Sequence, residues 1–256
     1  MDSREIERDG VRLHGLWRPG EGVPIVIVPG VMADARAFVP VADAMGRTAP
    51  VLILDRRGRA PSGPLGEGYA VSTEVADLRA WLDELGTPAD LVGWSYGATI
   101  AIEVAALDDR VRRVIGYEPV LGPFGADALP ALRAADPDAR VEIINRDVSG
   151  FSAEHVAALR AGPAWAQLRR LAEPLAAELV ALNAFEPDPA WQRVPVALIL
   201  GEQNRGHHPY GPAFDRVAAR LPRSTTTLLP DQGHLAHVDD PVALGTMIGT
   251  LLDDQS

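Results

Sequence analysis

The chain has 256 residues, of which 47% are hydrophobic, and its 35 acidic residues exceed its 24 basic ones, so the formal net charge is −11. It has no cysteine, which excludes disulfides, thiolate metal sites and a cysteine nucleophile. All 24 basic residues are arginine, which excludes a catalytic lysine, a lysine-bound Schiff base and the lysine of a P-loop. Nucleic acids and anionic lipids bind clusters of cationic side chains, and a chain with a net negative charge is poorly suited to them. We therefore predict no nucleic-acid partner.

The length suits one domain of about 200–250 residues that carries an insertion. Residues 1–10 are polar and charged and lack the apolar stretch of a secretory signal. No apolar run reaches the length that spans a membrane. We therefore expect a cytoplasmic protein without a membrane partner.

The first half of the chain alternates short apolar runs with helical patterns. Residues 6–17, with Asp9-Gly10 at their centre, predict a two-stranded hairpin. The β-branched runs 25–28 and 51–54 predict strands, and the amphipathic stretch 71–85 predicts a helix that ends before Gly86. Shorter strands are predicted at 91–92 and 114–115, on either side of a helix at 98–106.

This alternation stops between residues 122 and 190, where the sequence is rich in alanine and repeatedly interrupted by proline or glycine. The pattern favours helices and contains no convincing buried strand. We therefore expect a helical insertion at 122–190 and a core made of residues 1–121 and 191–256.

Beyond the insertion, the sequence predicts strands at 196–200 and 225–229 and a helix from Asp240-Pro241 to residue 252. Asp240 is suited to the N-cap position, and Pro241 is already fixed at a helical φ. Continuous apolar runs are typical of strands that are buried on both faces of a parallel sheet. The pattern indicates an α/β fold with a mostly parallel central sheet flanked by helices.

A nucleophile is predicted at Ser95, in the sequence Gly93-Trp-Ser-Tyr-Gly97. This G-x-S-x-G pattern directly follows a predicted buried strand and precedes a predicted helix. Such a sharp turn leaves no room for Cβ atoms at the two glycine positions and exposes the serine Oγ. The helix N-terminus behind Ser95 adds N–H donors.

The matching base is predicted at His234, in the loop Pro230-Asp-Gln-Gly-His234 between the last strand and the last helix. A serine hydroxyl needs a base that accepts its proton, and imidazole is suited to that task near neutral pH. His14, His155 and His237 are assigned structural or surface roles. His207 and His208 are adjacent and lack a third ligand at coordinating spacing, so we predict no metal, and no cofactor.

With these motifs in place, the sequence resembles the α/β-hydrolase superfamily over nearly its whole length, and most closely its small, capped serine hydrolases of bacterial type. The matching segments are 25–30, 55–62, 93–97 and 229–241. The resemblance implies an oxyanion hole formed by the backbone N–H groups of Tyr96 and Val31. Family members usually carry His-Gly before the second donor, where this chain has Pro29-Gly30. Because the donors are main-chain groups, this change need not abolish the hole.

The resemblance also implies that the insertion is a cap or lid over the site. Its aromatic residues Phe151, Trp165 and Phe185 then face either the ligand pocket or the interior of the cap.

The third member of the triad departs from the usual family pattern. Relatives place an Asp in a G-x-x-D loop after the penultimate strand, where this chain has Gly201-Glu-Gln-Asn204. Asn204 cannot stabilise an imidazolium by charge. Some lipases of the superfamily take the acid from the position of Glu118, which is our prediction, with Glu202 and Asn204 as alternatives. Alternatively, Glu118 pairs with Arg56 or Arg57 and has no catalytic role.

The predicted activity is serine hydrolysis of an ester, lactone or thioester of a small, largely apolar substrate through an acyl-enzyme. A serine in place of the aspartate nucleophile disfavours the alkyl-enzyme routes of related dehalogenases and epoxide hydrolases. The alternatives are a lyase, perhydrolase or acyl transferase on the same fold, and a ligand-binding protein with a decayed triad. The sequence leaves the identity of the substrate and the oligomeric state open.

Overall fold

The computed structural model describes residues 1–253, which form one eight-stranded sheet in the order β1-β2-β4-β3-β5-β6-β7-β8. Its strands are β1 (Asp2–Arg8), β2 (Val11–Arg18), β3 (Ile25–Val28), β4 (Val51–Asp55), β5 (Ala89–Trp94), β6 (Val111–Tyr117), β7 (Val196–Gly201) and β8 (Ser224–Leu229). The pairs β1/β2 and β2/β4 are antiparallel and the other neighbours are parallel. The predicted α/β fold with a mostly parallel sheet is confirmed.

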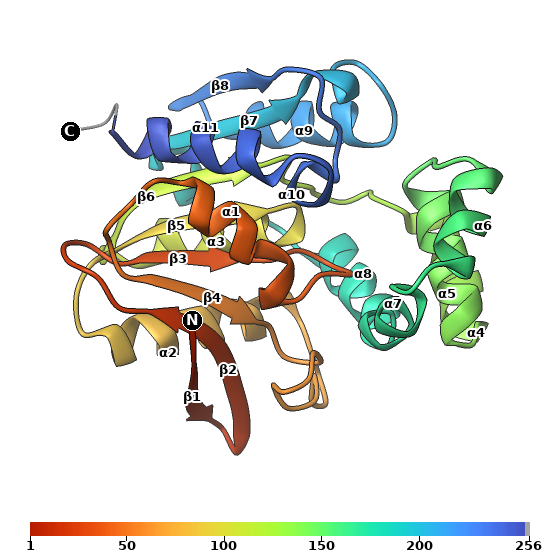
Figure 1. Ribbon diagram of the computed structural model, residues 1–256, viewed down its shortest axis with the longest axis horizontal. Helices are drawn as coiled ribbons and strands as arrows, with labels where there is room; N and C mark the ends of the chain where they lie inside the picture. Colours follow the sequence, from red (N-terminus) through yellow and green to blue (C-terminus); the bar gives the residue numbers. More distant parts are fainter. Residues whose placement is uncertain (254–256) are drawn as a thin grey trace.

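Helices cover both faces of this sheet (Figure 1). The α-helices are α1 (Val39–Ala44), α2 (Val71–Leu85), α3 (Tyr96–Leu107), α4 (Leu129–Ala134), α5 (Pro137–Ile143), α6 (Ala153–Ala161), α7 (Trp165–Leu171), α8 (Leu175–Ala184), α9 (Tyr210–Ala218), α10 (Ala236–Asp239) and α11 (Pro241–Asp253). Helices α2 and α3 pack on one face, and α1 and α11 pack on the other.

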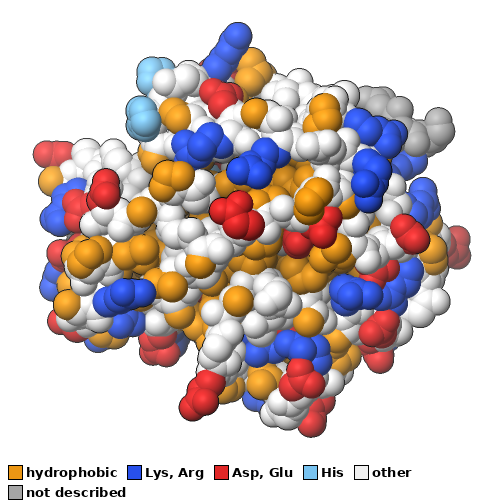
Figure 2. All heavy atoms as spheres, turned by 180° about the vertical axis from the view of Figure 1, so that it is seen from behind, with side chains coloured by type: hydrophobic (Ala, Val, Ile, Leu, Met, Phe, Trp, Pro, Cys, Tyr) orange, Lys and Arg blue, Asp and Glu red, His pale blue; other side chains and the backbone are white. Residues whose placement is uncertain are grey.

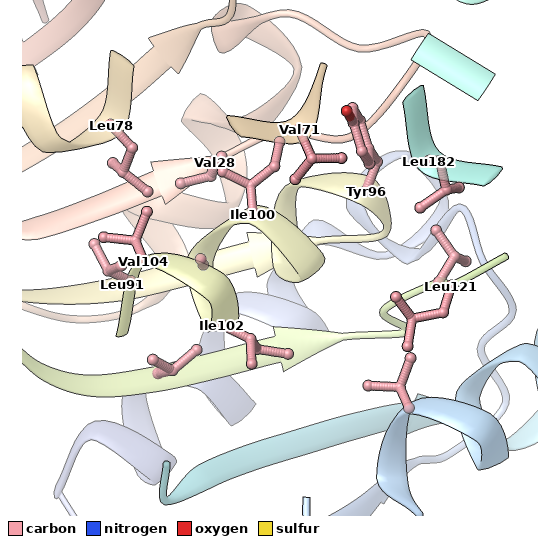
Figure 3. Packing of buried hydrophobic residues seen from close by; sticks show 14 of the residues in the cluster. Val28, Val71, Leu78, Leu91, Tyr96, Ile100, Ile102, Val104, Leu121 and Leu182 are labelled. Atoms are coloured by element: carbon pink, nitrogen blue, oxygen red, sulfur yellow. The ribbon is translucent and has the colours of Figure 1, made fainter. Parts of the chain in front are cut away.

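The strands in the middle of the sheet are buried on both faces, as their continuous apolar sequences predict. In β3, Val26 and Val28 join the core beneath α2 and α3, whereas Ile25 and Ile27 join the core beneath α1 and α11. Figure 3 shows the first of these cores, in which Val28 lies close to side chains of α2 and α3. Fully burying each such side chain contributes roughly 1.5–3 kcal/mol.

The hairpin at 6–17 is confirmed, because β1 and β2 pair in register up to Arg8 and Val11. Its turn residues have positive φ, 51° at Asp9 and 74° at Gly10, a conformation that glycine adopts readily. Strand β8 differs from the prediction of two buried faces. It lies at the edge of the sheet, and only its last residue, Leu229, is buried.

The two principal helix predictions are confirmed at their ends. Helix α2 stops at Gly86, which has a left-handed φ of 64°. Helix α11 begins at Pro241, and the Asp240 carboxylate accepts a hydrogen bond from the N–H of Ala243 at 2.9 Å. Helices α1, α9 and α10 have no counterpart among the predicted elements.

Between β6 and β7 the described chain forms helices α4–α8 and no strand. In Figure 1 these helices lie beyond the carboxyl ends of the parallel strands, away from the helices that cover the two faces of the sheet. The division into a core and a cap at residue 122 stays a prediction.

Within residues 1–253, no helix combines the length and the apolar character needed to cross a bilayer. On the face drawn in Figure 2, arginine and acidic side chains are interspersed.

Candidate active site

Ser95 lies at the bend between β5 and α3. Its backbone has φ 56° and ψ −122°, a conformation that residues other than glycine rarely adopt. The two flanking glycines are required by close packing. A Cβ on Gly93 would lie 2.3 Å from the Cα of Ala98, and one on Gly97 would lie 2.0 Å from the oxygen of Val28. The bend therefore has the local geometry that the G-x-S-x-G pattern predicts.

Glu118, which follows β6, lies against His234. Its Oε2 is 2.6 Å from His234 Nδ1, and the carboxylate is fully buried. The Glu118 backbone has a positive φ of 43° and its N–H donates to the oxygen of Ile199 on β7. The carboxylate also accepts the N–H of Gly201 at 2.9 Å. The structure thus brings together the end of β6, the end of β7 and the histidine loop.

The alternatives for the acid occupy other positions. Asn204 donates its amide to both oxygens of Glu118, each at 2.9 Å, so it holds the carboxylate instead of replacing it. Glu202 accepts a hydrogen bond from the N–H of Asp231. The alternative that Glu118 pairs with Arg56 or Arg57 is wrong, because those side chains bind other carboxylates.

The His234 ring is held on two sides by aromatic residues that the sequence analysis missed. Tyr210 stacks on it with 3.5 Å between ring centroids, and the Tyr210 hydroxyl is 2.9 Å from Ser149 Oγ. The Trp94 indole packs on the ring and donates to the main-chain oxygen of His234 at 2.9 Å. Tyr117 donates its hydroxyl to the oxygen of Gly233. Trp94 lies inside the G-x-S-x-G pattern, whereas Tyr210 has no local signal.

The Pro29-Gly30 loop lies directly beside Ser95. A Cβ on Gly30 would be 2.7 Å from the oxygen of Trp94 and 3.0 Å from the Cβ of Ser95, so only glycine allows this approach. Val31, the next residue, lines the same cavity as Ser95. Tyr96 is the first residue of α3, and the N–H of a first helical residue has no acceptor within its own helix. The two N–H groups predicted for the oxyanion hole therefore belong to segments that flank Ser95.

Ser95 and His234 open into one cavity of about 220 Å³ between the sheet and the helices that follow β6. Its lining residues are Val31, Met32, Trp94, Ser95, Phe124, Ile144, Asn145, Ser149, Phe151, Leu159, Ala164, Leu168, Tyr210, His234, Leu235, His237 and Val238. Most of them are apolar, and no Arg, Asp or Glu lines the cavity among the described residues. Such a cavity fits a small, uncharged group.

Of the three aromatic residues singled out between β6 and β7, only Phe151 lines this cavity. Trp165 donates its indole N–H to Asp138 of α5, at 2.6 Å. Phe185 packs on Trp191, with 6.3 Å between ring centroids. These two residues therefore stabilise the packing of the helices around them.

The remaining histidines differ in their surroundings. His237 is buried between Phe38, on which it stacks at 4.8 Å, and Trp94, and burial lowers its pKa to about 3. It also lines the cavity, which the assignment of a structural or surface role did not foresee. His207 and His208 are exposed, and residues 1–253 contain no group of three or more His, Asp or Glu side chains placed to hold a metal.

Comparisons with known proteins agree with this architecture. The model of the alpha/beta hydrolase family matches residues 25–244. N-formylmaleamate deformylase of Pseudomonas putida is 34% identical over 131 residues, which is 49% of this chain and 48% of the relative. The chain spans about half the length of the curated relatives that it matches first.

Solved structures match over nearly the whole chain. An alpha/beta hydrolase from Sphaerobacter thermophilus has a TM-score of 0.80 and 24% identity, and covers 97% of this chain and 100% of its own. The enol-lactonase from Burkholderia xenovorans has a TM-score of 0.79 and 19% identity, and covers 97% and 99%. At these identities the two structures establish the fold alone.

Proposed function

Because the chain belongs to the alpha/beta hydrolase family, we propose that it is a serine hydrolase that cleaves an ester, lactone or thioester through an acyl-enzyme. The observation that carries the proposal is the hydrogen bond of 2.6 Å between Glu118 and His234, beside a strained Ser95 that opens into the same cavity. A buried carboxylate, an imidazole and a serine in this arrangement are the parts of nucleophilic acyl transfer.

In the proposed mechanism, Ser95 Oγ attacks the carbonyl carbon of the substrate while His234 Nε2 accepts the hydroxyl proton. Glu118 holds the opposite nitrogen, Nδ1, and stabilises the imidazolium that forms. The developing oxyanion binds the N–H groups of Val31 and Tyr96, each of which contributes about 3 kcal/mol to the transition state. His234 then protonates the leaving group, and water hydrolyses the acyl-enzyme by the same steps.

The proposed substrate is small and uncharged in the part that enters the cavity. The cavity of about 220 Å³ has no Arg, Asp or Glu among its described lining residues. A carboxylate placed there would lose its hydration without gaining a charged partner, which is costly. Its few polar groups, such as Asn145 and Ser149, are suited to neutral hydrogen bonds.

A fluorophosphonate probe tests the catalytic role of Ser95. We expect covalent labelling of the natural protein at Ser95, located by mass spectrometry of the modified peptide, and no labelling at that peptide in Ser95→Ala. Absence of labelling in the natural protein, under conditions where a reference serine hydrolase reacts, would favour a ligand-binding protein.

A panel of aryl esters tests the substrate class and the reaction type. We expect esters with short neutral acyl chains to be cleaved at least about 10-fold faster than an ester whose acyl chain ends in a carboxylate. Hydrolysis in ¹⁸O-water should place the label in the released acid. Release of the alcohol without any labelled acid would point to acyl transfer or lyase chemistry.

A further inference from the structure

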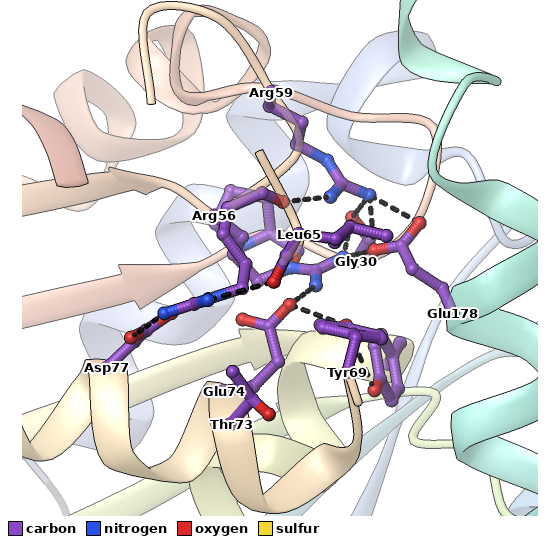
Figure 4. A network of polar contacts seen from close by, with 12 residues as sticks. Gly30, Arg56, Arg59, Leu65, Tyr69, Thr73, Glu74, Asp77 and Glu178 are labelled. Atoms are coloured by element: carbon purple, nitrogen blue, oxygen red, sulfur yellow. Dashed lines mark hydrogen bonds and ion pairs between the residues drawn. The ribbon is translucent and has the colours of Figure 1, made fainter. Parts of the chain in front are cut away.

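Arg56 lies beneath the loop that precedes Val31, where it binds two successive main-chain oxygens (Figure 4). Its Nε donates to the oxygen of Pro29 at 2.7 Å and its Nη2 donates to the oxygen of Gly30 at 2.9 Å. The side chain of Arg56 is only 1% exposed. A rigid, planar cation that binds two adjacent carbonyls restricts the orientation of both peptide groups.

Two buried carboxylates from different helices hold Arg56 in place. Its Nη1 donates to Glu74 of α2 at 2.6 Å, and its Nη2 donates to Glu178 of α8 at 2.7 Å. Burial opposes the charge of Arg56, but Glu74 and Glu178 raise its pKa well above the ordinary value, so the side chain stays cationic. Arg59 also contacts Glu178 at 2.8 Å, which balances two arginines against two glutamates.

The bond to Gly30 matters for the site because the oxygen of Gly30 and the N–H of Val31 belong to the same peptide group. This peptide bond is trans, so its C=O and N–H point in opposite directions within one plane. The C=O points to the buried arginine, and the N–H therefore points away from the charge cluster. A cation that donates to the C=O also polarises the group, which makes its N–H a stronger donor.

The second predicted oxyanion residue contacts the same guanidinium. The Cζ of Arg56 is 4.9 Å from the ring centroid of Tyr96, and the Tyr96 hydroxyl is 3.3 Å from that of Tyr69. Tyr69 in turn donates to Glu74 at 2.6 Å. Residues on both sides of Ser95 are thus joined to one buried cluster, which also includes Glu178 from the helices beyond the sheet.

We infer that Arg56, held by Glu74 and Glu178, is a positioning residue that orients and polarises the Gly30–Val31 peptide as an oxyanion donor. Arg56 touches no reacting atom and acts through the peptide group. This inference rests on the proposed function. Glu178 then links α8 to the active site, because it holds the arginine from the side of the helices between β6 and β7.

Arg56→Lys tests the inference, because lysine keeps the charge but cannot bind two carbonyls and two carboxylates at once. We expect kcat for an aryl ester and the rate of fluorophosphonate labelling to fall about 10-fold to 100-fold, with KM changed less than about twofold. Arg57→Lys is the matched control. The neighbouring Arg57 is also buried but binds Asp77 and the oxygen of Leu65, so its variant should keep both rates within about twofold.

A second measurement is independent of activity. The ¹³C shift of the Gly30 carbonyl and the ¹⁵N shift of Val31 report the hydrogen bond at the Gly30 oxygen, and both should move in Arg56→Lys but not in Arg57→Lys. If Arg56→Lys does not fold, Glu178→Gln replaces it, with an expected loss in kcat of about 3-fold to 10-fold.

The outcomes separate this inference from the proposed function. Unchanged carbonyl shift, labelling rate and kcat in a folded Arg56→Lys or Glu178→Gln would leave the cluster with a purely structural role and overturn the inference. A natural protein that neither labels at Ser95 nor cleaves esters would overturn both, whatever the shifts show.

Discussion

Among the described residues, two sets of serine, histidine and carboxylate side chains share a short hydrogen bond between the carboxylate and the histidine. At the proposed active site, Glu118 Oε2 lies 2.6 Å from His234 Nδ1. At the hairpin, Asp55 Oδ2 lies 2.7 Å from His14 Nδ1, and Ser3 Oγ lies 2.7 Å from His14 Nε2. By these distances alone, the hairpin set is the more complete triad, because hydrogen bonds join all three of its side chains.

The surroundings of the two serines differ. Ser3 lies within the regular strand β1, whereas Ser95 is strained at a bend and lines a cavity. The Gly30 backbone packs against Ser95, and the next residue, Val31, is a proposed oxyanion donor. Asp55 Oδ1 accepts the N–H of Ala35, which ties β4 to the chain after β3. Hydrogen-bonded serine, histidine and carboxylate side chains therefore also occur without a cavity beside them, and the strain, the cavity and the proposed backbone donors are what set Ser95 apart from Ser3.

Removal of each serine should show the largest difference between the two sets. We expect Ser95→Ala to lower kcat for ester hydrolysis by about 10⁶-fold, because the covalent route is lost. Ser3→Ala should leave kcat/KM within about twofold, because Ser3 does not line the cavity in which the substrate is proposed to bind. Steady-state kinetics and labelled-peptide mapping measure both. Labelling at Ser3 that survives in Ser95→Ala would show that the hairpin set is also reactive.

The two carboxylates provide the next largest difference. Glu118→Gln should lower kcat about 10²-fold to 10⁴-fold, because an amide cannot stabilise the imidazolium. Asp55→Asn should lower the melting temperature instead, since Asp55 is buried and joins three segments, and should keep kcat within about threefold. Rates are compared below the melting temperature of each variant. Unimpaired acyl-enzyme turnover in Glu118→Gln would eliminate the assignment of the acid.

The parts of the site that the sequence predicts best are those with local steric requirements. Gly93 and Gly97 must lack Cβ atoms because the backbone approaches within 2.3 Å and 2.0 Å of those positions, and this requirement leaves a short pattern. The parallel strands β3–β7 likewise follow from continuous apolar runs, whereas the edge position of β8 depends on the order of the whole sheet.

Contacts between distant residues leave no such pattern. Asn204 reaches Glu118 across 86 positions, and the sequence analysis considered it only as a replacement for the acid. Arg56 reaches Glu178 across 122 positions, so the sequence offered no reason to pair them. The stacking of Tyr210 on His234 depends on where α9 packs, which no residue near Tyr210 specifies.

A third buried histidine, His237, differs from His14 and His234 because it has no hydrogen bond to a carboxylate among the described residues. His237 Nδ1 is buried with no hydrogen-bond partner among the described residues, and burial lowers the His237 pKa to about 3. The unfolded chain, with an imidazole pKa of about 6.5, binds more protons than the folded one between these values. The stabilising contribution is therefore present above pH 6.5 and is lost as the pH falls towards 3.

From pH 7 to pH 5 this loss amounts to about 2 kcal/mol of unfolding free energy. We expect His237→Phe, which keeps the stack on Phe38, to remove that part of the pH dependence in urea titrations at the two pH values. His207→Gln changes an exposed histidine and should keep the natural pH dependence. Equal losses in the natural protein and in His237→Phe would contradict the assignment of a neutral, buried ring.

The smallest expected effect concerns the side-chain amide of Asn204, which contacts Glu118. Asn204 donates to both oxygens of Glu118, whereas Gln203 beside it donates to the oxygen of Asp231 in the histidine loop. Asn204→Ala should lower kcat about 10-fold with KM unchanged, because the carboxylate then has fewer donors that fix it against His234. Gln203→Ala should stay within about twofold. Equal losses in both variants would mean that the loop as a whole, and not the amide, sets the position of Glu118.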